Sequence, residues 1–448
     1  MKMVEPVEAV PSGLFPLAAA LRDGSLPLLD YLAWLEKHFE AREPEVKAFV
    51  PEEGRFERLH RRARLLLEQY PQPASRPPLF GIPLGVKDIF HVSGFLTRAG
   101  SDLPPERLAG AEAPVVTALK KAGVLILGKT VTTEFAYFAP GPTRNPHDPA
   151  HTPGGSSSGS AAAVGAALCP LALGTQTIGS VIRPAAFCGV VGYKPSYDRV
   201  SREGVIPLSP SLDHVGFFTP EVAGAERVAA LVCASWQPPV AGALVERALP
   251  RLGVPQGPYL ENATPESLRH FHALCDRLQD AGVEVRTVPA MAEFERVVAQ
   301  HRALMAAEAA AVHKAWGEFT TRYHPRTSEL LARGRRQQAE EVAAARAGRE
   351  AFRRELLALM DEHHVDLWIA PAAPGPAPQG LDSTGDPIMN LPWTYSGLPV
   401  LGMPSGFAES GLPLGVQFIG RWHGDEALLQ WGNQLYTLIE NVLERMEE

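Results

Sequence analysis

Residues 81–90, Gly-Ile-Pro-Leu-Gly-Val-Lys-Asp-Ile-Phe, form an apolar run that surrounds a single lysine. Short apolar runs bounded by Gly, Pro and Ser recur at residues 123–128 and 168–173, and each of the three predicts a buried strand. Residues 111–122 have the apolar spacing of a helix that leads into the second strand. Strands that alternate with helices indicate an α/β protein whose sheet is covered on both faces.

On both sides of this core, the sequence pattern alternates between helix-like and strand-like segments. Residues 28–40 and 55–68 repeat apolar residues at helical spacing, and residues 333–364 are rich in Ala, Arg and Glu at helical spacing. Residues 400–404 and 414–420 return to short apolar runs and predict core strands. Because strand-like runs occur at both ends and no internal repeat separates them, we expect one domain, 1–448. Its parts are an N-terminal helical segment (1–75), a core (79–220), a variable helical region (221–370) and C-terminal strands with a helix that complete the core (371–448).

Composition narrows the class of protein. Of the 448 residues, 45% are hydrophobic and 21% are charged, which is ordinary for a globular chain and excludes wholesale disorder. Forty-two Lys and Arg residues against 50 Asp and Glu residues give a net charge of −8. The chain lacks the basic surplus typical of nucleic-acid binders, so we expect no nucleic-acid partner.

The spacing of the cysteines and the length of the apolar stretches indicate the cellular compartment of the protein. The four cysteines include no Cys-x-x-Cys pair, so they predict neither a disulfide framework nor a zinc site. The longest apolar stretch, residues 161–174, is too short to span a bilayer and contains Pro170. Glu5 and Glu8 lie among prolines near the first residue, unlike a signal peptide. We therefore expect a cytoplasmic enzyme without metal or membrane association; a homodimer is compatible with the sequence.

Residues 154–160, Gly-Gly-Ser-Ser-Ser-Gly-Ser, precede an Ala-rich run, so N–H and hydroxyl groups gather at an expected helix N-terminus. A phosphate-binding loop would need a lysine directly after the glycines, and the next lysine is Lys194. A Gly-x-Ser-x-Gly nucleophile motif fits residues 155–159 with Ser157 at its centre, but a Pro-rich loop precedes it where a strand is needed. A flexible connector is equally compatible with this segment alone.

Two further segments offer groups for nucleophilic catalysis. In residues 174–184 an apolar strand ends in small and hydroxylated residues, where Ser180 is a candidate nucleophile; an ordinary turn fits equally well. Burial lowers the pKa of a lysine, so Lys87 is a candidate general base, although a pair with Asp88 is the simpler explanation. No histidine occurs in the three segments, and a lysine that acts through a second hydroxyl group supplies the base that a serine nucleophile needs.

Together these residues resemble the amidase signature family. The resemblance covers nearly the whole chain and is specific, because six stretches occur in the family's order. They are GIPLGVKD (81–88), GGSSSGSAAA (154–163), GTQTIGSVIRPAAFCG (174–189), VGYKPS (191–196), SGLPV (396–400) and GLPLGVQFIG (411–420). The resemblance implies a mixed, mainly parallel central sheet covered by helices on both faces.

The resemblance also implies a Ser–cis-Ser–Lys triad that hydrolyses a carboxamide C–N bond through an acyl-enzyme and releases ammonia or an amine. In this sequence Ser180 matches the nucleophile, Ser156 the bridging serine after a cis peptide bond, and Lys87 the base. No metal ion or organic cofactor is required. The oxyanion hole would consist of the backbone N–H groups of Thr177, Ile178, Gly179 and Ser180.

The nucleophile loop departs from the common family form, Asp-Thr-Gly-Gly-Ser-x-Arg. Gln176 replaces the acidic residue, Ile178 replaces the first glycine, and Arg183 follows Ser180 by three positions instead of two. This form resembles the malonamidase-like branch, in which the matching arginine suits a carboxylate-bearing acyl group. Arg183 is expected either to bind the carboxylate of a small, malonamate-like half-amide or to tie the loop to the core.

Other candidate site residues carry weaker signals. Gly155, which adjoins the bridging serine, is a candidate substrate-binding residue, and the hydroxyl of Thr177 is a candidate to hold Ser156 or substrate. Phe135, with Tyr137 and Phe138, is a candidate wall of an acyl pocket, although aromatic residues after a strand more often belong to the core. The pair Asp213-His214 resembles a family segment near the site, and we interpret it as structural.

Several functions remain open. We expect a free-standing amidohydrolase that acts on a small-molecule amide. The alternative is the amidase subunit of a tRNA-dependent amidotransferase, which usually carries an Asn-Leu-Ala-Arg-Tyr-Asp-Gly-like stretch; residues 300–350 instead predict an Ala/Arg/Glu helix. Broad acyl or aryl amide hydrolysis and carbamoyl-type (allophanate-like) hydrolysis are further options. A binding protein on an inactive scaffold is disfavoured because all three triad positions are filled.

Overall fold

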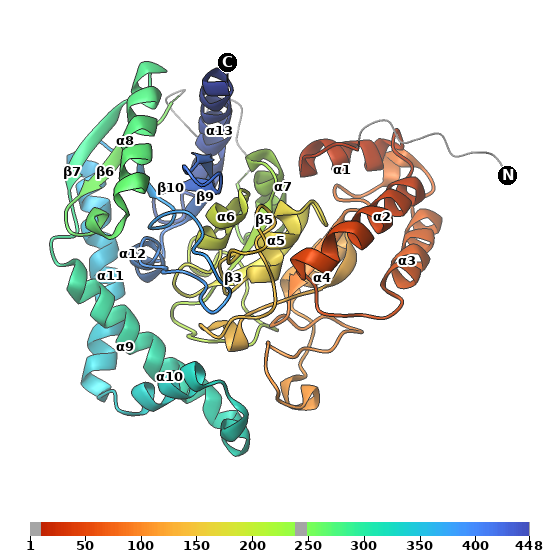
Figure 1. Ribbon diagram of the computed structural model, residues 1–448, viewed down its shortest axis with the longest axis horizontal. Helices are drawn as coiled ribbons and strands as arrows, with labels where there is room; N and C mark the ends of the chain where they lie inside the picture. Colours follow the sequence, from red (N-terminus) through yellow and green to blue (C-terminus); the bar gives the residue numbers. More distant parts are fainter. Residues whose placement is uncertain (1–9, 238–248, 448) are drawn as a thin grey trace.

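The computed structural model describes residues 10–237 and 249–447, so Glu5 and Glu8 lie outside the described residues. Within these ranges, ten strands form a sheet with the order β2-β1-β3-β5-β4-β9-β10-β8-β6-β7 (Figure 1). The strands are β1 (Pro83–Lys87), β2 (Leu125–Thr130), β3 (Leu171–Gln176), β4 (Val191–Lys194), β5 (His214–Thr219), β6 (Leu252–Gln256), β7 (Val285–Pro289), β8 (Leu367–Pro371), β9 (Val400–Phe407) and β10 (Pro413–Ile419).

The sheet is mixed, as predicted, but it is not mainly parallel. Pairing is parallel at its two ends, in β2-β1-β3 and in β8-β6-β7. The five pairs between β3 and β8 are all antiparallel, so the expectation of a mainly parallel sheet is wrong for the middle. The hairpin of β9 and β10 shows one reason: residues 408–412 join these strands, and a parallel connection needs a crossover of about a dozen residues or more.

Helices pack around this sheet, with α1–α3 together at one end and α8–α11 at the other (Figure 1). The predicted helices at residues 28–40, 55–68 and 111–122 are confirmed, and residues 333–364 contain the end of one helix and the whole of the next. The α-helices are α1 (Leu14–Asp23), α2 (Leu28–Val46), α3 (Arg55–Gln69), α4 (Pro114–Lys121), α5 (Ser158–Gly165), α6 (Ile182–Cys188), α7 (Val222–Val232), α8 (Pro265–Asp280), α9 (Phe294–Val312), α10 (Pro325–Arg335), α11 (Ala339–Glu362), α12 (Leu391–Ser396) and α13 (Asp425–Glu447).

Two neighbouring residues of β9 show that helices cover both faces of the sheet. A Cβ on Gly432 of α13 would lie 2.3 Å from Leu401, so α13 packs on the face to which Leu401 points. A Cβ on Gly402 would lie 3.0 Å from Ile182 of α6. Because successive strand residues point to opposite faces, α13 and α6 lie on opposite sides of β9. The predicted covering of both faces is confirmed here.

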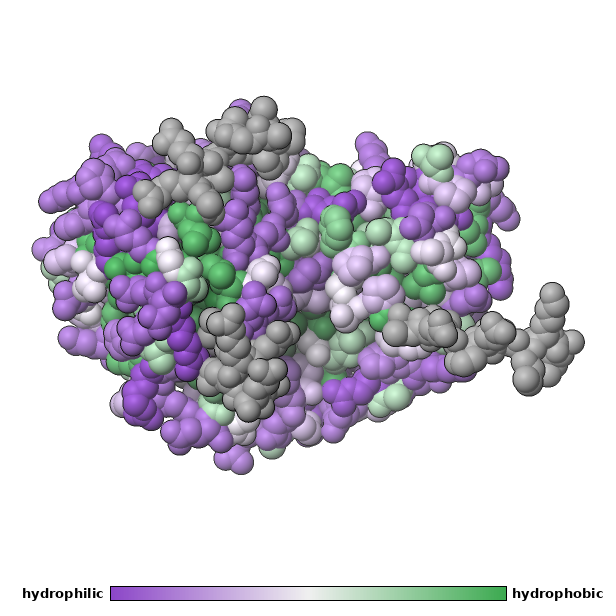
Figure 2. Space-filling view, turned by 90° about the horizontal axis from the view of Figure 1, so that it is seen from above, coloured by the Kyte–Doolittle hydropathy of each residue, from purple (hydrophilic) through white to green (hydrophobic). Residues whose placement is uncertain are grey.

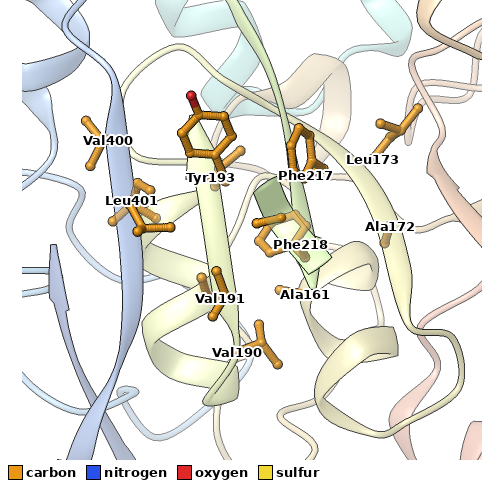
Figure 3. Close-up of a cluster of buried hydrophobic side chains, with 14 of the residues drawn as sticks. Ala161, Ala172, Leu173, Val190, Val191, Tyr193, Phe217, Phe218, Val400 and Leu401 are labelled. Carbon is orange, nitrogen blue, oxygen red and sulfur yellow. The ribbon is translucent and has the colours of Figure 1, made fainter. Parts of the chain in front are cut away.

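A row of large apolar side chains crosses the middle of the sheet (Figure 3). Leu173 of β3 pairs with Phe217 of β5, Phe217 pairs with Tyr193 of β4, and Tyr193 pairs with Leu401 of β9. All four are fully buried, and the rings of Tyr193 and Phe217 have their centroids 5.4 Å apart. The register of these central strands is thereby specified by burial of one continuous face.

Helix α5 explains how the serine-rich segment lies deep in the molecule. Its sequence, Ser-Gly-Ser-Ala-Ala-Ala-Val-Gly, has only small side chains apart from one valine, and the helix contacts β1, β2, β3 and β5. A Cβ on Gly159 would lie 2.1 Å from the carbonyl oxygen of Ala48 and 2.4 Å from the nitrogen of Val131. The small residues therefore let the helix N-terminus approach the carboxyl ends of β1 and β3.

The surface is predominantly hydrophilic on the face shown in Figure 2, with hydrophobic residues interspersed among polar ones. Within residues 10–237 and 249–447, none of the helices combines the length and the apolar character needed to cross a bilayer.

Candidate active site

Lys87 ends strand β1 and is fully buried. Burial lowers the pKa of its amine well below the usual value, and the negative charge of Asp213 opposes part of that shift. The amine therefore gives up its proton far more readily than an exposed lysine. Its Nζ is within hydrogen-bond distance of three hydroxyl oxygens: Ser156 Oγ (2.8 Å), Ser157 Oγ (3.0 Å) and Thr175 Oγ1 (2.8 Å).

Asp88 does not pair with Lys87. Its carboxylate lies 2.7 Å from Nζ of Lys129, which belongs to the neighbouring strand β2. Consecutive strand residues point to opposite faces, so the two lysines serve two separate environments. Lys129 is in an ion pair, whereas Lys87 is surrounded by hydroxyl groups.

The serine-rich segment is buried and hydrogen-bonded, so it is not an exposed connector. The peptide bond between Gly155 and Ser156 is cis. Ser157 Oγ donates to the carbonyl oxygen of Thr175 and accepts from its N–H, both at 3.2 Å. Ser158 Oγ donates to the carbonyl oxygen of Gly154 at 2.8 Å. Of the three consecutive serines, Ser157 orients Lys87 and β3, and Ser156 faces the pocket.

Ser156 and Ser180 line the same narrow pocket. The side chains become more exposed from Lys87 (0%) through Ser156 (2%) to Ser180 (8%), which is the order from the core to the pocket. The structure thus brings the three residues together at the carboxyl ends of β1 and β3. Thr177, Ile178, Arg183 and Leu208 complete the pocket wall together with Ala136, Tyr137, Phe138 and Pro387.

The loop after β3 presents unused backbone donors. In the described part of the chain, the N–H groups of Ile178, Gly179 and Ser180 donate to no protein atom. Gln176 holds the next turn, because its Oε1 accepts from the N–H groups of Val181 (2.8 Å) and Ile182 (3.0 Å). The glutamine thus uses a side-chain oxygen as an acidic residue at this position would. A row of free donors beside Ser180 can stabilise negative charge on an oxygen.

Thr177 begins this loop and is bonded from two sides. Its hydroxyl donates to the carboxylate of Asp213 at 2.6 Å, and its carbonyl oxygen accepts from Nε2 of His301 at 2.9 Å. Burial raises the pKa of Asp213 to about 6, while the bond from Thr177 acts in the opposite direction. Burial also lowers the pKa of His301 to about 4, so its imidazole is neutral at pH 7. The Thr177 hydroxyl is therefore used by Asp213, not by Ser156.

Arg183 lies within the fold, 1% exposed. Its Nη2 donates to the carbonyl oxygen of Gly155 at 2.6 Å and to Oγ1 of Thr384 at 3.1 Å, and its Nη1 donates to the carbonyl oxygen of Gly385 at 3.0 Å. Burial lowers the pKa of Arg183 to about 10, which leaves it charged at neutral pH. Arg183 thus ties Gly155 to a loop far along the chain, and Nε is the guanidinium nitrogen without a partner among the described residues.

Phe135 is not part of the pocket wall. It is 1% exposed, and its ring packs against His313, Trp316 and Tyr323 from the segment after α9. Neighbouring Tyr137 and Phe138 line the pocket instead. The residue proposed from sequence as a pocket wall therefore belongs to an aromatic cluster behind it.

Sequence reasoning missed several contacts at the site. Ser157 and Thr175 are partners of Lys87, and Thr394 donates to the carbonyl oxygen of Ile178 at 2.5 Å. Ser157 and Thr175 lie next to the motif residues Ser156 and Gln176 in the sequence, and this adjacency was the available indication that they belong to the site. Thr394 is more than 200 residues from Ile178 and gave none. Among residues 10–237 and 249–447, no three His, Cys, Asp or Glu side chains gather in a cluster that could hold a metal ion.

The fold is that of a family of hydrolases that act on amides. The family model named Amidase matches residues 36–429, and the chain belongs to this family. A glutamyl-tRNA(Gln) amidotransferase subunit from Thermus thermophilus is 35% identical, over 86% of this chain and 90% of that protein. The corresponding subunit from Synechococcus sp. is 31% identical, over 92% and 94%.

Solved structures agree with the family. A crystal structure of an amidase superposes with a TM-score of 0.84 at 33% identity, covering 96% of this chain and all of that one. Native peptide amidase from Stenotrophomonas maltophilia has a TM-score of 0.80 at 25% identity, covering 96% and 97%. The protein is therefore an amide-hydrolysing enzyme with the amidase signature fold.

The relatives correct one expectation. Their name describes one component of a larger enzyme and a substrate carried on tRNA, which contradicts the expectation that nucleic acid plays no part. The expectation came from the net charge of −8. That charge describes one chain alone, and in a complex another protein can supply the basic surface that binds RNA.

Proposed function

We propose that the protein hydrolyses a carboxamide C–N bond with Ser180 as nucleophile, Ser156 as proton carrier and Lys87 as general base. The observation that carries the proposal is the 2.8 Å hydrogen bond between Lys87 Nζ and Ser156 Oγ, in a site where burial lowers the lysine pKa. A neutral amine beside a hydroxyl group is a competent base at neutral pH.

In the first half-reaction, neutral Lys87 accepts the proton of Ser156, and Ser156 accepts the proton of Ser180. Ser180 Oγ then attacks the carbonyl carbon, and the free N–H groups of Ile178 to Ser180 bind the oxyanion. Ser156 passes a proton to the leaving nitrogen as the C–N bond breaks, and protonated Lys87 returns its proton to Ser156. This step yields ammonia or an amine, an acyl-enzyme and neutral Lys87. Water, deprotonated along the same route, releases the carboxylic acid and restores Ser180.

The test is ammonia release by three variants: Lys87→Ala, Ser156→Ala and Ser180→Ala. We expect each to lower kcat about a thousandfold or more, with an unchanged far-UV circular dichroism spectrum. Ser158→Ala is the matched control, because it removes a buried hydroxyl group of the same segment that bonds to Gly154 and not to Lys87. Near-normal turnover in Lys87→Ala or Ser180→Ala would overturn the triad.

For the substrate, we propose a carboxamide that carries an anionic group. From the sequence, Arg183 is expected either to bind that group or to tie the loop to the core, and its bonds to Gly155, Thr384 and Gly385 support the role of a tie. The comparison of Arg183→Ala with wild type on matched carboxylated and neutral amides separates the two roles. An unchanged ratio supports the tie, and a selective loss of the carboxylated substrates supports binding of the carboxylate.

A role within an amidotransferase is the second candidate function. It is supported by the relatives named as components of glutamyl-tRNA(Gln) amidotransferase, which match over most of both chains. The test is isolation of the tagged chain from its own cells, followed by assay of ammonia release from glutamine. A stoichiometric second protein on which glutamine hydrolysis depends would favour this function. Robust hydrolysis of small amides by the isolated chain, without activity on glutamine, would disfavour it.

A further inference from the structure

A second, larger pocket opens directly beside the serine pocket. Its volume is about 520 Å³, in the usual range for small-molecule sites. The two pockets share four wall residues, so they adjoin. These residues are Tyr137, Phe138, Ile178 and Pro387. We call this larger space the outer pocket.

Three arginines line the outer pocket. Arg302 comes from α9, and Arg326 and Arg333 come from α10, which packs on α9 (Figure 1). Arg326 and Arg333 are seven residues apart, which is two helical turns, so they share one face of α10. The fold thus brings three cationic side chains to the outer pocket.

Most N–H donors of these arginines have no partner among the described residues. Among the described residues, none of the three is in an ion pair with a carboxylate. Arg326 Nη1 donates to the carbonyl oxygen of Phe138 at 2.7 Å, and Arg333 Nη2 lies 3.4 Å from the hydroxyl of Tyr137. Each bond uses one of the five N–H donors of a guanidinium and directs the group toward the shared wall.

Two carboxylates also line the outer pocket, Glu329 and Asp386. Asp386 Oδ1 accepts from the N–H of Ile388 at 3.0 Å, and its charge acts on Arg183. With three arginines against two acids, the lining retains one positive charge. Charge-assisted, forked hydrogen bonds from arginine suit a carboxylate.

We propose that the outer pocket binds the carboxylate of an amide substrate and that Arg302, Arg326 and Arg333 recognise it. The inference rests on the proposed function and names the substrate class: amides whose carboxylate lies several bonds beyond the scissile C–N bond. Arg183 is buried and bonded to three protein oxygens, whereas the outer arginines keep free donors. A short half-amide that occupies only the serine pocket does not reach them.

The experiment uses the monoamides of malonic, succinic, glutaric and adipic acids, each paired with an alkyl amide that has a methyl group in place of the carboxylate. We expect kcat/KM to rise with chain length for the carboxylated series only. Arg302→Gln, Arg326→Gln and Arg333→Gln should each lower the preference for the longer carboxylated amides over the matched alkyl amides about tenfold, chiefly through a higher KM for the carboxylated substrates. Glu329→Gln should lower that KM, because it removes a repelling charge.

Two controls keep the outcomes separate. Arg335→Gln removes an exposed charge from the same helix outside the pocket, so it should not change the ratio of carboxylated to neutral substrates. Calorimetric titration of Ser180→Ala with the adipic monoamide measures binding without turnover. Weaker binding of the adipic monoamide when an arginine substitution is added to Ser180→Ala supports the outer pocket. If wild type hydrolyses none of the amides while this binding result holds, the outer pocket stands and the triad is overturned.

Hydrolysis with an unchanged preference in all three arginine variants overturns the outer pocket and leaves the triad standing. If the adipic monoamide does not bind to Ser180→Ala, the proposal for the outer pocket is also overturned.

Discussion

Replacement of Lys87 by methionine should remove a pH-dependent contribution to the stability of the protein. Burial holds the pKa of Lys87 well below its usual value, and in the unfolded chain a lysine has a pKa of about 10.4. Between these two pKa values the unfolded state binds one proton more than the native state. The free energy of unfolding therefore rises with pH across this window, by up to about 1.4 kcal/mol per pH unit from this one group.

Methionine is apolar and similar in length to lysine, but it does not titrate. Lys87→Met also leaves the hydroxyl groups of Ser156, Ser157 and Thr175 without the amine, at a cost that does not depend on pH. The difference in free energy of unfolding between wild type and variant isolates the lysine, because all other groups titrate in both proteins. Urea unfolding at several pH values between about 6 and 9 measures this difference.

We expect the difference to move in favour of the wild type as the pH rises. Parallel pH dependences for the two proteins would show that Lys87 is protonated in the native state at these pH values. That result would refute its assignment as a neutral base, independently of any substrate.

Three further predictions concern the groups around this lysine. Asp213→Asn removes a charge that favours protonated Lys87, so the pKa of the lysine should fall and the acid limb of the kcat/KM profile should move to lower pH. Thr177→Ser, which keeps the hydroxyl group that donates to Asp213, should leave the limb in place. A shift to higher pH in Asp213→Asn would contradict the sign. Gln176→Ala should lower kcat about tenfold, because the turn after the nucleophile loses the acceptor of two backbone N–H groups. Gln176→Glu should restore most of the lost kcat. Equal kinetics in wild type and both variants would refute this role. Gly159→Ala should lower the free energy of unfolding by about 3 kcal/mol or more, because its Cβ would lie 2.1 Å from a backbone oxygen, and an unchanged melting temperature would contradict the packing of α5.

The parts of the fold that follow from local pattern could be predicted from sequence. Buried strands such as β1 consist mainly of consecutive apolar residues, and this pattern can be recognised in the sequence without knowledge of the neighbouring strands. Strand alternation also separates the two lysines: Lys87 pairs in register with Thr130 and Val86 with Lys129, so Lys87 and Lys129 point to opposite faces, and Asp88 meets Lys129 just beyond β1. The simpler expectation of a Lys87–Asp88 pair neglected this alternation.

Features that depend on distant segments could not be predicted in this way. The antiparallel middle of the sheet arises because β4, β5, β9 and β10 come together from two halves of the chain. Phe135 turns away from the pocket because His313, Trp316 and Tyr323, almost 200 residues later, provide an aromatic cluster for its ring. The guanidinium of Arg183 is occupied by a loop that lies some 200 residues further along. No spacing within the motifs contains this information.

The most direct test of the proposed mechanism is covalent labelling with a fluorophosphonate, with the modified residue located by mass spectrometry. Wild type should carry the label on Ser180, Ser180→Ala should carry none, and Lys87→Ala should react with Ser180 far more slowly, because the base that activates the serine is missing. Labelling of Ser157 in place of Ser180, or equal rates in wild type and Lys87→Ala, would contradict the triad.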